Sequence, residues 1–418
     1  MTDIKATPGP KRALDQQDER LQHNVGFGGA VSGALHKIRN GDLGSLPVIV
    51  GLVVVWTVFQ ILNPIFLSSD NLVNLTLESV SVGVIALGVV CVLLVGQIDL
   101  SVGSVSGLTA AILAILFVGH NWPVWGAILV ALAAAAAIGL GYGVLFNRFG
   151  MPSFVATLAG LLAFLGLQLY LLGDTGSINI PFTSSLVKFA QQDFVPTALS
   201  YLLAALAAVA VFVSGYLLAA RRRRGGLSAK SLQAIVLRSV AVLVVAELVC
   251  WYLNRSRGVG WMFVFFIVLV AVLNYALTRT KWGRSMFAVG GNAEAARRSG
   301  INVKRVYASA FLLCSTLAAV GGILGAARLG SANQSSGTGD VNLDAIAAAV
   351  IGGTSLFGGR GSAFSALLGI IVIQSISSGL TLLNLSSSFR FMITGLVLAL
   401  AVAIDSLARK SRASHGQA

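Results

Sequence analysis

Long apolar runs recur along most of this 418-residue chain. A helix needs roughly 17 to 25 mainly apolar residues to cross a hydrocarbon layer about 30 Å thick. The runs that meet this requirement, or come close to it, lie at 46–65, 79–96, 101–119, 123–146, 153–172, 195–220, 233–253, 259–278, 306–327, 343–357, 363–384 and 389–408. The sequence therefore predicts an all-α, polytopic helical membrane protein with about 12 hydrophobic segments, broken or half helices included.

Composition excludes an ordinary soluble protein. Hydrophobic residues make up 56% of the chain and charged residues 11%, whereas a soluble domain is about 25% charged. A membrane β-barrel would instead show segments of roughly ten residues with alternating polarity, and no such alternation recurs here.

The net charge of +14 follows membrane topology and does not indicate a nucleic-acid partner. If the N-terminus is cytoplasmic, all but five of the 29 lysines and arginines fall at cytoplasmic ends and loops, as the positive-inside rule requires. The five exceptions are Lys188, Arg255, Arg257, Arg328 and Arg390. We therefore expect both termini in the cytoplasm, with tails at 1–45 and 409–418 around a transmembrane domain at 46–408.

Residues that could carry out chemistry are scattered. Cys91, Cys250 and Cys314 lie in apolar runs, where a cysteine usually serves as a small packing residue. We find no disulfide framework, no metal-ligand spacing and no HExxH or GxSxG motif. The sequence predicts neither an enzyme nor a bound cofactor or metal.

Three stretches interrupt the hydrophobic density with Asp, Gly or Pro, at 97–107, 147–160 and 344–359. The last would rise only about 24 Å as a helix, less than the hydrocarbon thickness. It is predicted to be a half helix or a broken helix. Irregular backbone at membrane depth is tolerated where protein or a watery cavity covers it, and such breaks commonly mark a transport path.

Two aspartates stand at these interruptions, Asp99 in QIDLSVGS and Asp344 in GTGDVNLDAIAAAVIGG. We expect each to cap the helix that follows, with Ser101 as an alternative cap beside Asp99. A direct contact with a transported solute, a gate, or a hydrogen bond between helices remains open for Asp99.

A short charged helix is predicted between two apolar runs, within FAVGGNAEAARRSGINVKRV at 287–306. Asn292 would cap a helix that begins at Ala293, and Gly300 would end it. Such a helix is either a solvated connector or a rigid peg for the groove of a partner.

AVGGNAEAARRSGI resembles the cytoplasmic coupling segment of bacterial ABC-importer permeases for monosaccharides, the ribose, galactose and xylose group. QIDLSVGS, NRFGMPSFVATLAG and NLDAIAAAVIGGTSLFGGRGS resemble other characteristic stretches of that group, in the expected order, so the resemblance covers roughly 46–408. It implies a transport subunit that couples to a separate ATPase chain. The coupling residues it implies are Asn292, Glu294, Ala295, Ala296, Arg297, Arg298 and Gly300.

The resemblance also implies a substrate and partners. Ribose-type relatives have fewer helices, whereas the added apolar pair at about 195–257 resembles xylose-transport permeases, so D-xylose is the expected sugar. The implied partners are an ABC ATPase, a periplasmic sugar-binding protein and a second permease copy, in the bilayer of a bacterial inner membrane. Candidate residues along the translocation path are Gln97, Asp99, Ser101, Ser104, Asn333, Asn342, Asp344 and Thr354.

The alternative is an ion-coupled secondary sugar transporter. Such a transporter uses acidic residues deep in the membrane as proton relays. Apart from Glu247, the apolar runs of this chain offer few such residues.

Overall fold

The computed structural model describes residues 46–386, 388–389, 391–396, 399–400 and 403. Nine helices in these ranges are long and apolar enough to cross a membrane. They are α3 (Ser69–Leu94), α4 (Val102–Ala114) with its π-helical continuation Ile115–Gly119, α5 (Val124–Phe149), α6 (Ser153–Leu172), α8 (Thr197–Arg224), α9 (Leu232–Leu253), α10 (Trp261–Arg279), α13 (Val303–Leu329) and α15 (Ala363–Leu382).

Two shorter apolar helices, α2 (Leu46–Leu62) and α14 (Val341–Ile351), also match predicted segments, α14 as the expected half helix. The polytopic helical fold is therefore confirmed. The predicted tails, and half of the predicted crossing at 389–408, lie outside the described residues.

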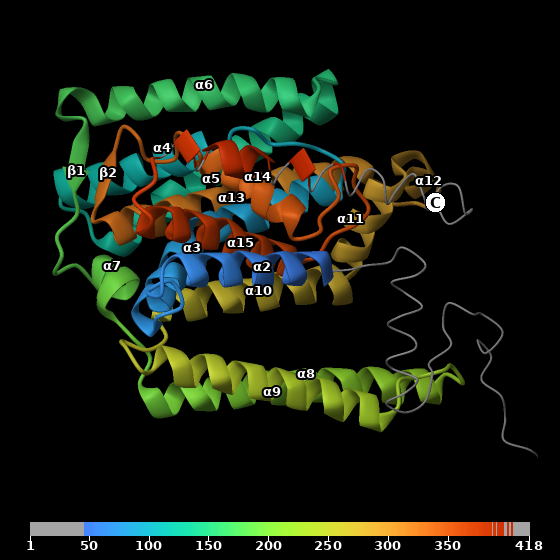
Figure 1. The fold of residues 1–418 in the computed structure, drawn as a ribbon. Coiled ribbons are helices and arrows are strands. Elements are labelled where there is room, and N and C mark those ends of the chain that lie inside the picture. The colour runs from blue at the N-terminus through green and yellow to red at the C-terminus, as the bar shows by residue number, and fades with distance from the viewer. Residues whose placement is uncertain (1–45, 387, 390, 397–398, 401–402, 404–418) are drawn as a thin grey trace, which may run out of the picture. The chain divides into compact units, whose positions relative to one another are not determined.

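The chain forms two compact units. The described part of one unit, Pro196–Arg255, is the antiparallel hairpin of α8 and α9 (Figure 1). Asn254 Nδ2 donates to Ser200 Oγ at 2.9 Å and ties one end of the hairpin. At the other end Arg222 Nε donates to the carbonyl of Ser228 at 2.6 Å, so the RRRRGG tract closes the turn between the two helices.

The core of the other unit is built on α13, which packs against α3, α4 and α5. Cys91 and Cys314 are buried on α3 and α13, as expected of packing residues. Small residues let these helices come very close. A Cβ on Gly322 of α13 would lie 2.0 Å from the carbonyl oxygen of Ser106 on α4, so only glycine fits there.

The predicted start of α3 is wrong by ten residues, since the helix begins at Ser69 and not at 79. Ser68 caps it, because its Oγ accepts the amide proton of Asn71 at 3.3 Å. The first turns carry Asp70, Asn74 and Glu78. These polar residues lower the local hydropathy, so the apolar run begins only after them.

A small antiparallel sheet lies at the end of this unit opposite α11 (Lys281–Gly291) and α12 (Ala293–Arg298) (Figure 1). Strand β1 (Ser177–Asn179) pairs with β2 (Ser331–Asn333), with Ile178 opposite Ala332. The long connection at 173–194 also contains three short helical turns, Gly173–Thr175, α7 (Ser185–Val187) and Lys188–Gln192. Segments of three to five residues carry no periodic signal, so the sequence could not predict them.

The close approach of α13 and α4 predicts that Gly322→Ala destabilises the protein. The added methyl group would overlap the backbone of α4, and overpacking costs on the order of 1–3 kcal/mol, more than the gain in helix propensity of up to about 1 kcal/mol. We expect a lower apparent Tm of the purified protein in detergent. Gly141→Ala on α5, where nothing lies within 4 Å of the added methyl, is the control and should leave Tm unchanged or slightly raised. An unchanged Tm for Gly322→Ala would contradict this packing.

Candidate functional site: a charged surface helix beside two breaks in the membrane segments

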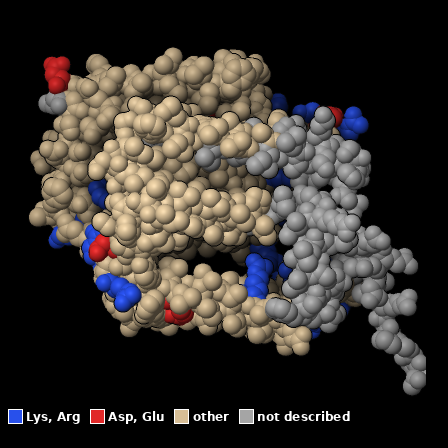
Figure 2. Space-filling view, viewed as in Figure 1, with Lys and Arg blue, Asp and Glu red and all other residues tan. Residues whose placement is uncertain are grey.

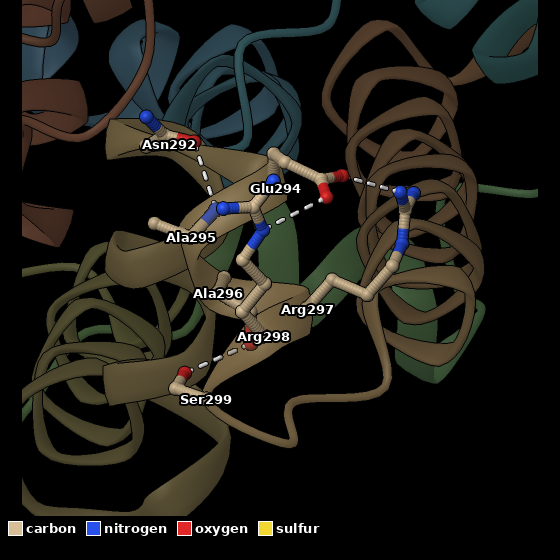
Figure 3. A network of polar contacts seen from close by, with 7 residues as sticks. All are labelled: Asn292, Glu294, Ala295, Ala296, Arg297, Arg298 and Ser299. Carbon is tan, nitrogen blue, oxygen red and sulfur yellow. Dashed lines mark hydrogen bonds and ion pairs between the residues drawn. The ribbon is translucent and has the colours of Figure 1, made fainter.

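The predicted short helix is present as α12, and its ends are formed as expected. Asn292 Oδ1 accepts the amide proton of Ala295 at 2.9 Å (Figure 3). Gly300 has a φ of 85°, a left-handed conformation that favours glycine and ends the helix. The capping and stop residues at 292 and 300 are thus confirmed as structural predictions.

The charges of α12 face outward. Glu294 forms ion pairs with Arg297 at 2.6 Å and with Arg298 at 3.3 Å (Figure 3), and the three side chains are 55%, 64% and 81% exposed. Exposed pairs of this kind contribute only about 0.3–0.5 kcal/mol. Ala296 is buried and holds the helix to the rest of the unit, whereas Ala295 is exposed. In the space-filling view, blue and red atoms gather at the edge where α12 lies (Figure 2).

A second helix, α11, precedes α12, and the sequence does not predict it, because it falls between the apolar run 259–278 and the expected short helix. Thr280 Oγ1 caps it by accepting the amide proton of Gly283 at 3.2 Å. Trp282 Nε1 donates to Ser309 Oγ at 2.9 Å and joins α11 to α13. Met286 and Val289 of α11 are buried, so this helix packs against the rest of the unit.

The last turn of α11 meets two other backbone segments. A Cβ on Gly290 would lie 1.7 Å from the carbonyl oxygen of Leu94, where α3 ends, and 2.5 Å from the amide nitrogen of Gly359. The latter two groups hydrogen-bond to each other at 2.9 Å. A Cβ on Gly358 would likewise meet the carbonyl oxygen of Gly290, at 2.8 Å. We call this meeting of residues 94, 290, 358 and 359 the glycine junction.

The break between α3 and α4, at 95–101, is held by side chains of α6. Thr157 Oγ1 accepts the amide proton of Leu100 at 3.1 Å, and Ser153 Oγ that of Ile98 at 3.4 Å. These hydroxyls replace the helical partners that the freed amides have lost. Gln97, a predicted path residue, is half-buried in this break.

Asp99 is 2% exposed and turns inward at the same break. Its Oδ1 accepts from the amide and the hydroxyl of Ser101, at 2.9 and 2.7 Å. Tyr142 of α5 donates to Ser101 Oγ at 2.7 Å, so the network joins α5 to the break. The capping prediction is wrong in detail: Ser101 occupies the cap position but its side chain binds no helical amide, and Asp99 binds Ser101 itself.

The second break follows α14. The predicted cap at Asp344 is wrong, because α14 begins at Val341 and places Asp344 inside its first turn, behind Asp340 at the cap position. A carboxylate there still suits the helix dipole. Thr354, in the irregular segment after α14, is buried, and its Oγ1 has no hydrogen-bond partner among the described residues. The third predicted interruption, 147–160, contains an ordinary exposed connection at 150–152 between α5 and α6.

The chain from β2 to the first turn of α14 packs on α4 and brings several predicted path residues together. Asn342 Oδ1 accepts the amide proton of Gly103, next to Ser104, which is buried and donates to the carbonyl of Ser101 at 2.9 Å. Asn333 lies next to α6, because Gln168 Nε2 of α6 donates to the backbone carbonyl of Asn333 at 3.0 Å.

Sequence reasoning missed Gln168. It is fully buried, and the same nitrogen also donates to the carbonyl of Ser336 at 2.9 Å. The sequence feature that could have identified Gln168 is its place as a single amide side chain within the apolar run LLAFLGLQLYLL. Such a lone polar group must find a partner inside the protein.

Comparison with known proteins places this arrangement in a family. Residues 71–402 match the family model described as "Branched-chain amino acid transport system / permease component". The xylose transport system permease protein XylH of Escherichia coli K12 is 35% identical over 347 residues, which cover 82% of this chain and 87% of that protein. XylH of Haemophilus influenzae is 31% identical, over 90% of this chain and all of that protein.

The ribose import permease protein RbsC of Escherichia coli K12 is 31% identical over 85% of this chain and 92% of its own length. No solved structure matches the chain. The matched region includes both breaks, the glycine junction and α12. The chain therefore belongs to this family of transport-system permease components, in the ABC-type monosaccharide group that includes the xylose and ribose permeases, and it is a transport subunit and not an enzyme.

Proposed function

We propose that this chain forms the membrane pathway of an ATP-driven monosaccharide importer, with D-xylose as the transported sugar. The sugar is proposed from the xylose permeases among its relatives. The family implies an ABC ATPase on the cytoplasmic side and a periplasmic binding protein on the other. A second copy of the permease would complete the pathway in the bacterial inner membrane, with both termini in the cytoplasm.

The observation that carries the proposal is the position of α12. It is short, capped at both ends and covered with exposed charge, and it directly follows a helix whose last turn abuts both breaks. A rigid exposed helix suits a groove on a partner. We infer that the ATPase binds α12 and that Asn292, Glu294, Arg297 and Arg298 provide the polar contacts.

The glycine junction can transmit a displacement of α12 to the membrane-spanning segments. Backbones in contact without side chains between them leave no space to absorb a displacement, because packed protein is not readily compressed. When ATP binding moves α12, α11 would therefore push on the end of α3 and on the segment after α14. Those segments flank the candidate path residues Gln97, Asp99, Ser101, Ser104 and Thr354.

A neutral sugar needs hydrogen-bond partners along its way, and the half-buried Asn333, Asn342 and Asp344 could offer them in turn. Weak contacts suit this role, because the soluble receptor provides affinity and a permease that bound sugar tightly would release it slowly.

Gly290→Ala should uncouple the transporter. The new methyl group would overlap the carbonyl of Leu94, although alanine itself favours the helix. In proteoliposomes with the ATPase and receptor, we expect sugar uptake to fall about tenfold or more, equivalent to some 1.4 kcal/mol, while the ATPase still co-purifies. Gly291→Ala is the matched control, since nothing lies within 4 Å of its added methyl. Equal uptake by the two variants would refute a role for the junction.

Glu294→Lys should weaken ATPase binding. The substitution places a third positive charge beside Arg297 and Arg298 and opposes the dipole at the helix start. We expect at least about a tenfold rise in the Kd for the ATPase, or 1.4 kcal/mol. The control is Asp174→Lys, an identical charge reversal at the exposed end of the unit near β1. Comparable loss in both variants, or in neither, would remove α12 from the interface.

The secondary-transporter alternative is tested in the same proteoliposomes. We expect uptake to persist when a protonophore collapses the proton gradient and to stop when ATP is withdrawn. Uptake that stops with the protonophore and persists without ATP would assign the chain to ion-coupled transport. The buried Asp99 would then be the candidate proton-binding residue.

A further inference from the structure

The first turns of α3 carry polar side chains four residues apart, at Asp70, Asn74 and Glu78. The first two hydrogen-bond to Ser256 and Arg257, in the connection that leads to α10. Glu78 differs, because its partners lie within other long apolar helices.

Glu78 holds together a small cluster from three helices. Its Oε2 accepts from Gln374 Nε2 of α15 at 2.7 Å, and its Oε1 lies 3.7 Å from the guanidinium of Arg328 of α13. Glu78 comes nine residues after the start of α3, and Gln374 eight residues before the end of α15. At 1.5 Å per residue, Glu78 lies about 14 Å and Gln374 about 12 Å from the nearer end of its helix. Arg328, in contrast, lies in the last turn of α13, one residue before its end, so the cluster joins the interior of α3 and α15 to the end of α13.

These charges are not sealed inside the unit. The side chain of Glu78 is 43% exposed and that of Arg328 is 29% exposed, although α3 as a whole is mostly buried. A carboxylate and a guanidinium facing hydrocarbon are strongly disfavoured, and such residues normally face a water-filled cavity or the interior of an assembly. The exposed side of this cluster thus borders water or a second protein surface.

The cluster also has unused hydrogen-bonding capacity. The ion pair is long, and Arg328 Nε is buried without a partner among the described residues. Glu78 offers acceptor oxygens, while Arg328 and Gln374 offer donors. The opposite charges cancel, so the site is suited to a neutral ligand that both donates and accepts.

We propose that Glu78, Arg328 and Gln374 form a binding station for the hydroxyl groups of a neutral sugar on the translocation path. This inference rests on the proposed import function. The station is lined by α3, α13 and α15, and α3 ends at the glycine junction, so a displaced α11 would alter the station through a single rigid helix.

Sugar discrimination separates a binding role from a structural one. In proteoliposomes with ATPase and receptor, uptake of D-xylose is compared with that of D-ribose, which differs in the orientation of one hydroxyl. We expect Glu78→Gln and Gln374→Leu to change the ratio of the two rates about tenfold, the effect of one charge-assisted hydrogen bond. Asp70→Asn, the same loss of charge about two turns away on α3, should keep the wild-type ratio. A purely structural role would lower both rates equally, and that result would overturn the station.

Water access provides a second, independent test. In a Cys250→Ser background, Glu78→Cys should react with a membrane-impermeant, water-soluble thiosulfonate, and saturating D-xylose should slow the reaction. Val268→Cys, at an exposed apolar position of α10, should not react. Reaction of Glu78→Cys with a lipid-soluble maleimide alone would place the cluster against lipid or a second copy and refute the proposal. Absence of ATP-dependent uptake by the wild-type complex would instead refute the import function itself.

Discussion

Amide and carbonyl groups that leave a helix inside a membrane must find hydrogen-bond partners within the protein, and this requirement governs both breaks of the larger unit. At the first break the hydroxyls of Ser153 and Thr157 accept the freed amides, and Asp99 binds Ser101. At the second, the amide of Gly359 binds the carbonyl of Leu94. The two irregular segments therefore complete each other's hydrogen bonding, and neither can shift without disturbing the other.

Because the two breaks depend on each other, α11 can affect both of them at once. Gly290 touches both partners of the hydrogen bond between the breaks, so α11 acts on the point where they are joined. The exposed charges of α12 lie only a few residues away, separated from the junction by Gly291 and Asn292. A force on the surface helix thus has a short path to irregular backbone, and the more distant helices need not deform.

Hydropathy was sufficient for most of the fold, because crossings such as α5, α6 and α10 are continuous apolar runs close to the predicted ranges. The cap at Asn292 and the stop at Gly300 were also predictable, since they depend on local backbone chemistry. Prediction failed where tertiary contacts decide the outcome. The start of α3 was hidden by polar residues whose partners lie far along the chain, and Asp344 could not be distinguished from a cap by sequence alone. The glycine junction has no sequence signature beyond its glycines, because it depends on three segments meeting in space.

The points where the α8–α9 hairpin leaves and rejoins the chain lie together. The amide of Val195 donates to the carbonyl of Val259 at 2.8 Å, and Phe194 pairs with Gly260 in an isolated antiparallel β-bridge. The sixty residues from Pro196 to Arg255 therefore start and finish at one place in the larger unit. An ancestral chain could acquire or discard such an appendage through a single genetic insertion or deletion, with the remaining crossings keeping their order and their direction through the bilayer.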